Sequence, residues 1–449
     1  MGILKSLNRQ QKEAVGLLQV GTFLEYFDLM LYVHMAVLLN ELFFPETDPH
    51  TAALLTAFAF CSTYVLRPFG ALVFGYIGDN IGRKTTVVLT TMMMSVSCVI
   101  MANLPTYAQI GITATWVITI CRVMQGLSSM GEVMSAQVYM TEITKPPVQY
   151  PAVSFIAAAS AAGGVAALGV ATLVTTTGFN WRIAFWIGAL IALVGSIART
   201  RLRETPEFLE KTNAYKNRKE GRITGEKEEK TSIEAFVDTR QEKIKIKNVV
   251  SYFAANCGCP LGFYLIYIYF NPTLKSMFAY SSEDIILHNF ILVLLHFATL
   301  LFLAIISYKI HPLKILRFIG CIFLGLAICL PSLVNLATSS YHVFALQALI
   351  VFFCIGTTPG DAIFIKHFPV LRRITATSLL YSLTLAITYV ITSFGLVYLT
   401  EFFGHYGLLL ITLPVALSYL WAVNHYAVLE SVRLPKLYFD FSKNEHGAA

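Results

Sequence analysis

Charged residues are scarce in this sequence. Asp, Glu, Lys and Arg make up 13% of the 449 residues, whereas soluble globular proteins carry about 25%. Hydrophobic residues reach 56%, and apolar runs of about 20 residues, long enough to cross a hydrocarbon core, recur along the whole chain. This composition excludes an ordinary soluble domain and predicts an all-α, polytopic membrane protein.

Several chemical groupings are also missing. The eight cysteines all fall inside apolar runs, where they behave as small hydrophobes, so no disulfide framework is expected. Cys257 and Cys259 have no further ligand at metal-binding spacing, so no metal site is expected. The apolar runs hold no nucleophile–base arrangement, which argues against an enzyme. The first apolar run is not followed by a small-residue cleavage site, so we expect the first helix to be retained.

The apolar runs and their breakers predict twelve transmembrane helices. We expect them near residues 15–40, 52–77, 85–104, 112–140, 152–176, 183–202, 249–272, 284–308, 315–335, 342–366, 375–400 and 406–428. They make two six-helix bundles, 1–202 and 249–430, separated by a linker, 203–248, and followed by a tail, 431–449. The linker is rich in Lys and Glu and poor in aromatic residues, which is typical of a solvated segment.

Basic residues are nearly absent from one set of loops. With the N-terminus inside, the outer loops hold only Arg182 and Lys275, while the inner loops, the linker and both ends are basic. Because Lys and Arg are retained on the cytoplasmic side, we expect a multi-pass inner-membrane protein with both termini cytoplasmic. This placement explains the net charge of +7 without a nucleic-acid partner. Two six-helix halves joined by an inner linker are typical of a parallel-repeat transporter.

The first predicted helix carries two carboxylates near its middle. Glu25, Asp28 and Tyr32 are spaced i, i+3 and i+7 and share one helix face. Ionisable groups inside a span are costly and are therefore candidates for function. Arg67 on the second helix is the nearest candidate cation, and a carboxylate that exchanges a proton for an arginine would suit proton coupling. A fixed Asp28–Arg67 ion pair would instead only join the two helices.

The fourth predicted helix carries a second polar set. Arg122 and Glu132 are ten residues apart, about 15 Å along a helix, so they cannot pair with each other. Arg122, with Gln125 beside it, has the geometry to bind a substrate carboxylate, although a packing role remains open. Glu132 is expected to exchange a proton, and Glu142, at the inner helix end, to join the charge network of a gate.

Glycine and proline interrupt two helices of the second half. Asn256 precedes Cys-Gly-Cys-Pro-Leu-Gly, with Tyr264 and Tyr267 following, and Asp361 ends the stretch Gly-Thr-Thr-Pro-Gly-Asp. Freed backbone groups at membrane depth are tolerated only where they line a cavity. We therefore expect Asn256, Tyr264, Tyr267 and Asp361 at a binding site, with kinks for packing as the alternative.

A short polar turn joins the second and third predicted helices. It holds Gly75, Asp79, Gly82 and Arg83, in the pattern G-x-x-x-D-x-x-G-R between two apolar runs. This pattern resembles the loop between helices 2 and 3 of the major facilitator superfamily. The resemblance implies that Asp79 and Arg83 form a cytoplasmic latch, which we expect Glu142 and Glu204 to join.

Further motifs resemble one branch of that superfamily, the metabolite:proton symporters. They are Glu25-Tyr26-Phe27-Asp28, Phe43-Phe44-Pro45, Arg67-Pro68-Phe69-Gly70-Ala71, Arg122 with Gln125-Gly126, Gly131-Glu132, Trp181-Arg182 and Arg203-Glu204-Thr205-Pro206. The second half departs from the pattern, since the stretch 307–314 lacks the Asp and the Gly-Arg pair.

The resemblance implies a monomeric secondary transporter that needs no cofactor beyond the proton gradient. It would move a small organic acid or zwitterion, such as proline or betaine, with protons across the lipid bilayer. Glu25, Asp28 and Glu132 would carry the proton, and Tyr32, Arg67, Arg122 and Gln125 would bind substrate. A proton-independent exchanger or an efflux protein is the alternative. A membrane sensor is disfavoured, because the linker of roughly 45 residues is shorter than a usual output domain.

Overall fold

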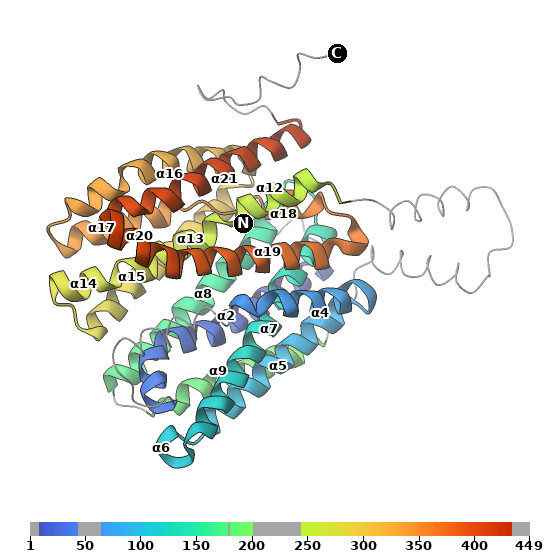
Figure 1. Cartoon of the computed structure of the whole chain (residues 1–449). Helices are drawn as coiled ribbons and strands as arrows, with labels where there is room; N and C mark the ends of the chain where they lie inside the picture. Colours follow the sequence, from blue (N-terminus) through green and yellow to red (C-terminus); the bar gives the residue numbers. More distant parts are fainter. Residues whose placement is uncertain (1–8, 44–63, 178–179, 201–243, 433–449) are drawn as a thin grey trace.

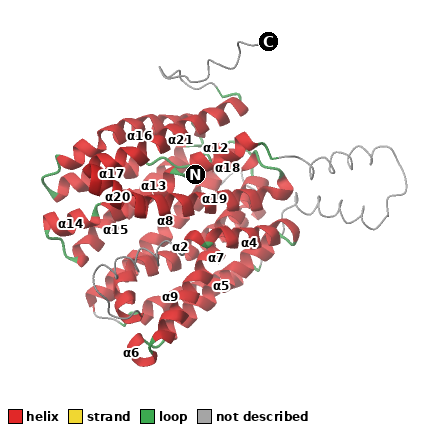
Figure 2. Ribbon diagram, viewed as in Figure 1, coloured by secondary structure: helices red, strands yellow, loops and turns green. Residues whose placement is uncertain are grey.

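The computed structural model describes residues 9–43, 64–177, 180–200 and 244–432, and these residues form helices and loops without a strand (Figure 2). The first half contains α2 (Arg9–Phe43), α4 (Arg67–Asn80), α5 (Arg83–Asn103), α6 (Tyr107–Ile110), α7 (Ile112–Ile143), α8 (Gln149–Thr177) and α9 (Arg182–Arg199). Each of the six helix ranges expected in this half contains helix.

The second half contains more, and shorter, elements. They are α12 (Ile246–Asn256), α13 (Gly258–Tyr264), η1 (Leu265–Tyr269), α14 (Asn271–Phe278), α15 (Ser282–Ile306), α16 (Pro312–Asn335), α17 (Ser340–Phe353), α18 (Asp361–Lys366), η2 (Val370–Arg372), α19 (Arg373–Val390), η3 (Ile391–Gly395), α20 (Leu396–Phe403), η4 (Gly404–Leu408) and α21 (Leu409–Leu429). The six ranges expected here contain helix as well.

Seven of the described helical stretches are long and apolar enough to cross a bilayer. They are Lys84–Asn103, Gln149–Leu173, Ile246–Phe278, Leu287–Ile306, Pro312–Asn335, Arg373–Gly395 and Tyr398–Leu429. Large apolar side chains such as Phe69, Trp116 and Phe318 are each about two-thirds exposed, as expected for side chains that face lipid. Buried threonine and serine hydroxyls donate to backbone carbonyls one turn earlier, as Thr22 does to Leu18, so they need no water.

The helices form two bundles (Figure 1). In the first, α2 packs on α8 and α9, and α5 packs on α7 and α9. In the second, α21 packs on α12 and α16. The bundles meet mainly along two helix pairs, α8 with α15 and α4 with α19, so each bundle contributes to the space between them.

One end of the molecule, which we call the latch end, joins the two bundles through an apolar core. It holds the end of α4, the start of α19 and the end of α21, at the right in Figure 1. Leu18 and Met140 of the first bundle share this core with Phe364, Phe368 and Tyr426 of the second. Burying such large side chains excludes water from the contact and favours the closed arrangement of this end.

The two helix interruptions expected in the second half differ in kind. Residues 354–360, between α17 and α18, are not helical, so the break before Asp361 is confirmed. Around Gly258 only Cys257 separates α12 from α13, and the Cys257 amide still donates to the Phe253 carbonyl. Glycine is needed at position 258 for a different reason. A side chain there would collide with the Ile355 carbonyl, so only glycine lets the backbones at residues 258 and 355 lie in contact.

Two wide π-helical turns, η1 and η3, interrupt the second bundle. Such turns leave backbone groups poorly bonded and occur mostly at functional sites. The Ile266 carbonyl in η1 accepts a hydrogen bond of 2.6 Å from the buried side chain of Gln347, which in turn contacts His288 at 2.7 Å. The turn is therefore built into the fold rather than left unsatisfied.

Candidate functional site

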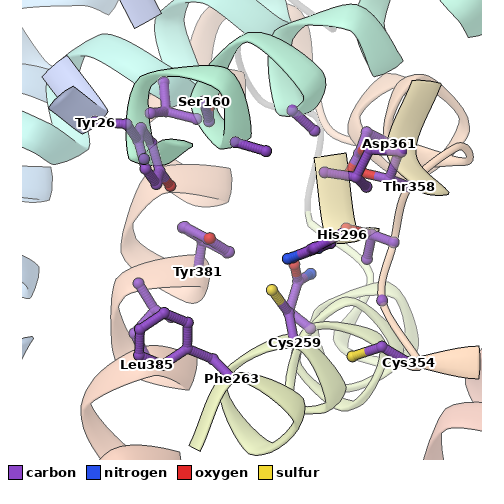
Figure 3. Close-up of a pocket in the computed structure, with 18 of the residues that line it drawn as sticks. Tyr26, Ser160, Cys259, Phe263, His296, Cys354, Thr358, Asp361, Tyr381 and Leu385 are labelled. Atoms are coloured by element: carbon purple, nitrogen blue, oxygen red, sulfur yellow. The ribbon is translucent and has the colours of Figure 1, made fainter. Parts of the chain in front are cut away.

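A central cavity of about 240 Å³ lies between the bundles and is lined by both. Its polar wall comes from nearly every surrounding element: Arg67, Gln137, Ser160, Asn256, His296, Thr357, Thr358 and Asp361, with Tyr26, Tyr64, Tyr252, Tyr267, Tyr381 and Tyr389 between them. In Figure 3, Tyr26 and Tyr381 lie across the cavity from Asp361 and Thr358, with His296 and Cys259 between.

Arg67 is the cation of this cavity wall. It begins α4, where Pro68 fixes the first turn, and its side chain is only 3% exposed. The guanidinium carbon lies 4.3 Å from the centre of the Tyr64 ring, a cation–π contact. Its Nε and Nη2 atoms have no hydrogen-bond partner among the described residues. A buried guanidinium with open donors is suited to bind an anionic group.

Aromatic rings from both bundles surround Arg67. Tyr64, just before α4, packs 4.3 Å from Tyr389 of α19 between ring centres. Phe263 of α13 touches Tyr389 and lies 5.0 Å from Tyr267. An anion on Arg67 would therefore sit where the two bundles touch, and would contact both.

Asp361 is the carboxylate of the opposite wall. It is 7% exposed and starts α18 directly after the broken segment. Its Oδ2 accepts a hydrogen bond of 2.7 Å from the Thr358 hydroxyl. None of the described Lys, Arg or His side chains forms an ion pair with it. The broken helix thus places a buried carboxyl group at the cavity, in the stretch where the sequence predicts a binding site.

The predicted binding residues divide into two groups. Arg67, Asn256, Tyr267 and Asp361 line the cavity together. Tyr264 is buried in the apolar core of the second bundle and is not part of the cavity lining. The side chains of Glu25, Tyr32 and Glu132 lie outside the described residues.

The remaining predicted polar residues cluster inside the first bundle, behind the cavity wall. Arg122 donates to Gln125 at 3.2 Å, and Gln125 contacts the Cys98 sulfur at 3.5 Å. Asp28 is 2% exposed and lies against Cys98 and Gly188. Arg122, Gln125 and Asp28 are therefore neighbours, and none of them is part of the cavity lining.

The turn after α4 forms a contact between the bundles at the latch end. Asp79 accepts hydrogen bonds from the backbone amide of Thr375 at 2.9 Å and from its hydroxyl at 2.6 Å. Thr375 is in the first turn of α19, whose own N-cap residue supplies no side-chain hydrogen bond. Asp79 therefore caps a helix of the other bundle, where a carboxylate is stabilised by the open amides and the helix dipole.

Two glycines make this contact possible. A side chain at Gly75 would place its Cβ 2.9 Å from the Thr375 Cα, so only glycine allows α4 and α19 to cross this closely. Gly82 has φ of 150°, a conformation that favours glycine, and it starts α5. The side chain of Arg83 and residue Glu204 lie outside the described residues.

A buried ion pair adds to the latch. Glu142 at the end of α7 accepts a bond of 3.2 Å from Arg373 of α19, and its side chain is fully buried. Removing one partner of such a pair leaves the other charge buried without compensation, which is strongly destabilising. Glu142 thus lies at the inter-bundle contact, where the sequence expected a gate residue.

Five residues that form part of the latch or of the cavity lining were not assigned from the sequence. Thr375 and Arg373 complete the latch, and His296, Tyr381 and Tyr389 line the cavity. The paired arginines, Arg372 and Arg373, were a usable signal, because they form a charged turn between two predicted spans. His296 was a candidate as an ionisable group inside a predicted span, although it was not assigned to the site. For Thr375, Tyr381 and Tyr389, local sequence holds no signal. Among the described residues, no group of three His, Cys, Asp or Glu side chains could hold a metal ion.

Comparison with known proteins agrees with this architecture. The chain resembles the proton:xylose symporter XylE, with a TM-score of 0.72 and 15% identity over 94% of this chain and 96% of that one. It also resembles the human organic anion transporter MFSD10, with a TM-score of 0.65 and 14% identity over 93% and 100% of the two chains. At such identities the likeness concerns the fold alone.

Among curated proteins, the inner membrane metabolite transport protein YhjE of Escherichia coli is 34% identical over 47% of this chain and 49% of its own. A proline/betaine transporter of Salmonella typhimurium is 28% identical over 44% and 41%. The matched segments thus span about half the length of these relatives or less. The sequence model of the Major Facilitator Superfamily matches residues 18–334. With two helical bundles around a shared cavity and a family match over most of its length, the chain belongs to the major facilitator superfamily.

Proposed function

We propose that this protein is a secondary transporter that carries a small carboxylate-bearing metabolite across the inner membrane, in symport with protons. The observation that carries the proposal is Arg67, a buried guanidinium whose Nε and Nη2 lack acceptors among the described residues of the cavity wall. Leaving such a group uncompensated is costly, and a bound carboxylate would remove the cost. Alternating opening of the two ends would then move the bound molecule.

The charges of the cavity favour a zwitterion over a simple acid. Arg67 and Asp361 both line the cavity, and Asp361 lies across it from Tyr381, so an ammonium group could be held at the Asp361 carboxylate while an anionic group binds Arg67. A molecule with one anionic and one cationic group would satisfy both walls. Proline and betaine have these groups, and one of the relatives described above is named a proline/betaine transporter.

Proton coupling is assigned to the carboxylates of the first bundle, Glu25, Asp28 and Glu132. Asp28 supports the assignment, because it is only 2% exposed. Burial disfavours the charged form of a carboxylate, so gain or loss of a proton changes the stability of the structure around Asp28. A proton-independent exchanger remains the second candidate. The loops rich in Lys and Arg favour a cytoplasmic latch end, with both chain termini on that side.

Ligand binding tests the cavity. Purified protein would be screened by thermal shift against proline, betaine, di- and tricarboxylates at pH 5.5 and 7.5. A true ligand at 100 times its Kd stabilises the protein by about 2.7 kcal/mol. We expect this shift to vanish in Arg67→Gln and to persist in Arg182→Gln, a control whose guanidinium bonds the Leu104 carbonyl outside the cavity. Equal shifts in both variants would refute Arg67 as the anion site.

Asp361→Asn tests the zwitterion. We expect it to weaken binding of proline or betaine while leaving or improving binding of a dicarboxylate, because it removes only the negative wall. Equal loss for both ligand classes would contradict the charge assignment.

Asp28→Asn tests coupling. In proteoliposomes, symport predicts loss of uptake driven by a pH gradient with counterflow of labelled substrate retained. If gradient-driven uptake is unchanged in Asp28→Asn, and in Glu25→Gln and Glu132→Gln, the exchanger is the better description.

A further inference from the structure

The segment between α18 and α19, residues 366–373, carries the arginine of the latch. Arg373 donates from Nη1 to Glu142 of the first bundle and from Nε to the Phe368 carbonyl, 3.2 Å away. The second bond fixes the guanidinium to its own segment. Where this segment lies therefore decides whether Arg373 reaches Glu142.

Glu430, at the end of α21, holds the other end of the same segment. Its Oε2 accepts from Lys366 Nζ at 2.7 Å, and its Oε1 contacts His367 Nε2 at 2.7 Å. Its side chain is 15% exposed, and those of Lys366 and His367 are 33% and 21% exposed. One carboxylate thus binds two consecutive side chains, which restricts rotation of the segment more than a single bond would.

The bundle around the segment supports this anchoring. Asn248 of α12 donates to the His367 carbonyl at 3.4 Å, and its own carbonyl groups are bound by His425 and Tyr426 of α21. Phe368 packs edge-on against Tyr252 of α12, 5.3 Å between ring centres. The polar contacts of residues 366–368 lead into the second bundle, while Arg373 reaches the first.

We propose that Glu430 is a positioning residue of the latch: by holding Lys366 and His367 on α21, it keeps Arg373 in reach of Glu142. The second half has lost the acidic turn that the first half keeps at Asp79. Glu430 supplies an acidic group to the second bundle at this end, from the last helix instead of from a loop. The inference rests on the proposed transport cycle only in that the latch must open and close.

The test follows opening of the latch end without any substrate, so a failure of the proposed function would not affect it. Cys259 lines the cavity and is exposed there. With the other seven cysteines replaced by Ser, a membrane-impermeant maleimide applied to the latch side would alkylate Cys259 only when that end opens. We expect Glu430→Gln to raise the alkylation rate about fivefold, the effect of weakening a part-exposed charged hydrogen bond.

A matched control exists on the same helix. Asn424 of α21 accepts a bond of 3.0 Å from Arg317 of α16 and has no contact with residues 366–373 among its described hydrogen bonds. We expect Asn424→Ala to leave the alkylation rate within twofold of the parent. An equal rise in both variants would mean that α21 merely loosened, and no rise in Glu430→Gln would also overturn the proposal.

A double-mutant cycle separates positioning from general stability. If Glu430 acts through Arg373, its effect requires Glu142, so the Glu430→Gln/Glu142→Gln variant should alkylate as fast as Glu142→Gln alone. If the two rate increases multiply, Glu430 acts independently and the assignment is wrong. Expression and melting temperature of each variant show whether it is folded.

Discussion

The bond from Asp79 to α19 gives a quantitative prediction for the latch. Asp79→Asn keeps the size of the side chain but removes the charge that two Thr375 donors share. A hydrogen bond to a charged group contributes roughly 1.5–3 kcal/mol, so we take about 2 kcal/mol for the loss. Since 1.4 kcal/mol is tenfold in an equilibrium constant, this is about 30-fold. A closed-to-open ratio of about 100:1 at the latch end would fall to about 3:1.

The assay measures a distance across the latch end. Lys145, after α7, and Arg372, before α19, are exposed and belong to different bundles. Spin labels at these two positions, in a background without native cysteines, would report one dominant distance in the parent protein. In Asp79→Asn we expect a second, longer distance that accounts for about a quarter of the population.

A matched variant separates charge from hydrogen bonding. Thr375→Val removes the hydroxyl but keeps the amide that donates to Asp79. We expect a loss of about 1 kcal/mol, so the longer distance should account for only a few per cent. If Asp79→Asn leaves the distance distribution unchanged, or opens the end no more than Thr375→Val does, the reasoning about the capping charge is refuted.

Two further predictions use other features of this end. Gly75→Ala should open the latch with little change in melting temperature, because its Cβ would clash with Thr375 across the bundles. Gly70→Ala places its Cβ against the Leu127 carbonyl within one bundle and should lower the melting temperature. If both variants changed latch opening and melting temperature equally, the prediction for Gly75 would be contradicted. Burial is the main cause that lowers the pKa of His367 and of His311 below the usual 6.5. Near and below pH 6.5 the folded state therefore binds fewer protons at these two histidines than the unfolded state does. Stability should therefore be full above pH 6.5 and decline as the pH falls below it, and His367→Gln/His311→Gln should flatten the decline in thermal unfolding curves.

The helices and the turn after α4 could be predicted because their signals are local. Apolar length predicts a span, and Gly75, Asp79 and Gly82 occur together within eight residues. The break before Asp361 was equally local, since glycine and proline destabilise a helix wherever it lies. Each of these features depends on neighbours in sequence.

The direction in which a residue faces could not be predicted in the same way. In a soluble protein the polar side of a helix marks the surface, whereas here the lipid-facing and core-facing sides are both apolar. Tyr264 and Tyr267 were therefore assigned to one site. Both are buried in the core of the second bundle, but only Tyr267 also lines the cavity. Pairings such as Glu142 with Arg373 join residues 231 positions apart, and no local pattern encodes them.

The π turn η1 has a consequence for the width of the cavity. Tyr267 belongs to this turn and lines the cavity, while the Gln347 side chain bonds the adjacent carbonyl of Ile266. A π turn holds one residue more than a turn of α-helix. If this wide turn shifted by one residue along the helix, the side chain of the residue it moved past would rotate by about 100° around the helix axis. Tyr267 could then swing out of or into the cavity while both bundles keep their positions. The Gln347 bond to the Ile266 carbonyl therefore fixes the register of the turn, and with it the place of the Tyr267 ring in the cavity wall.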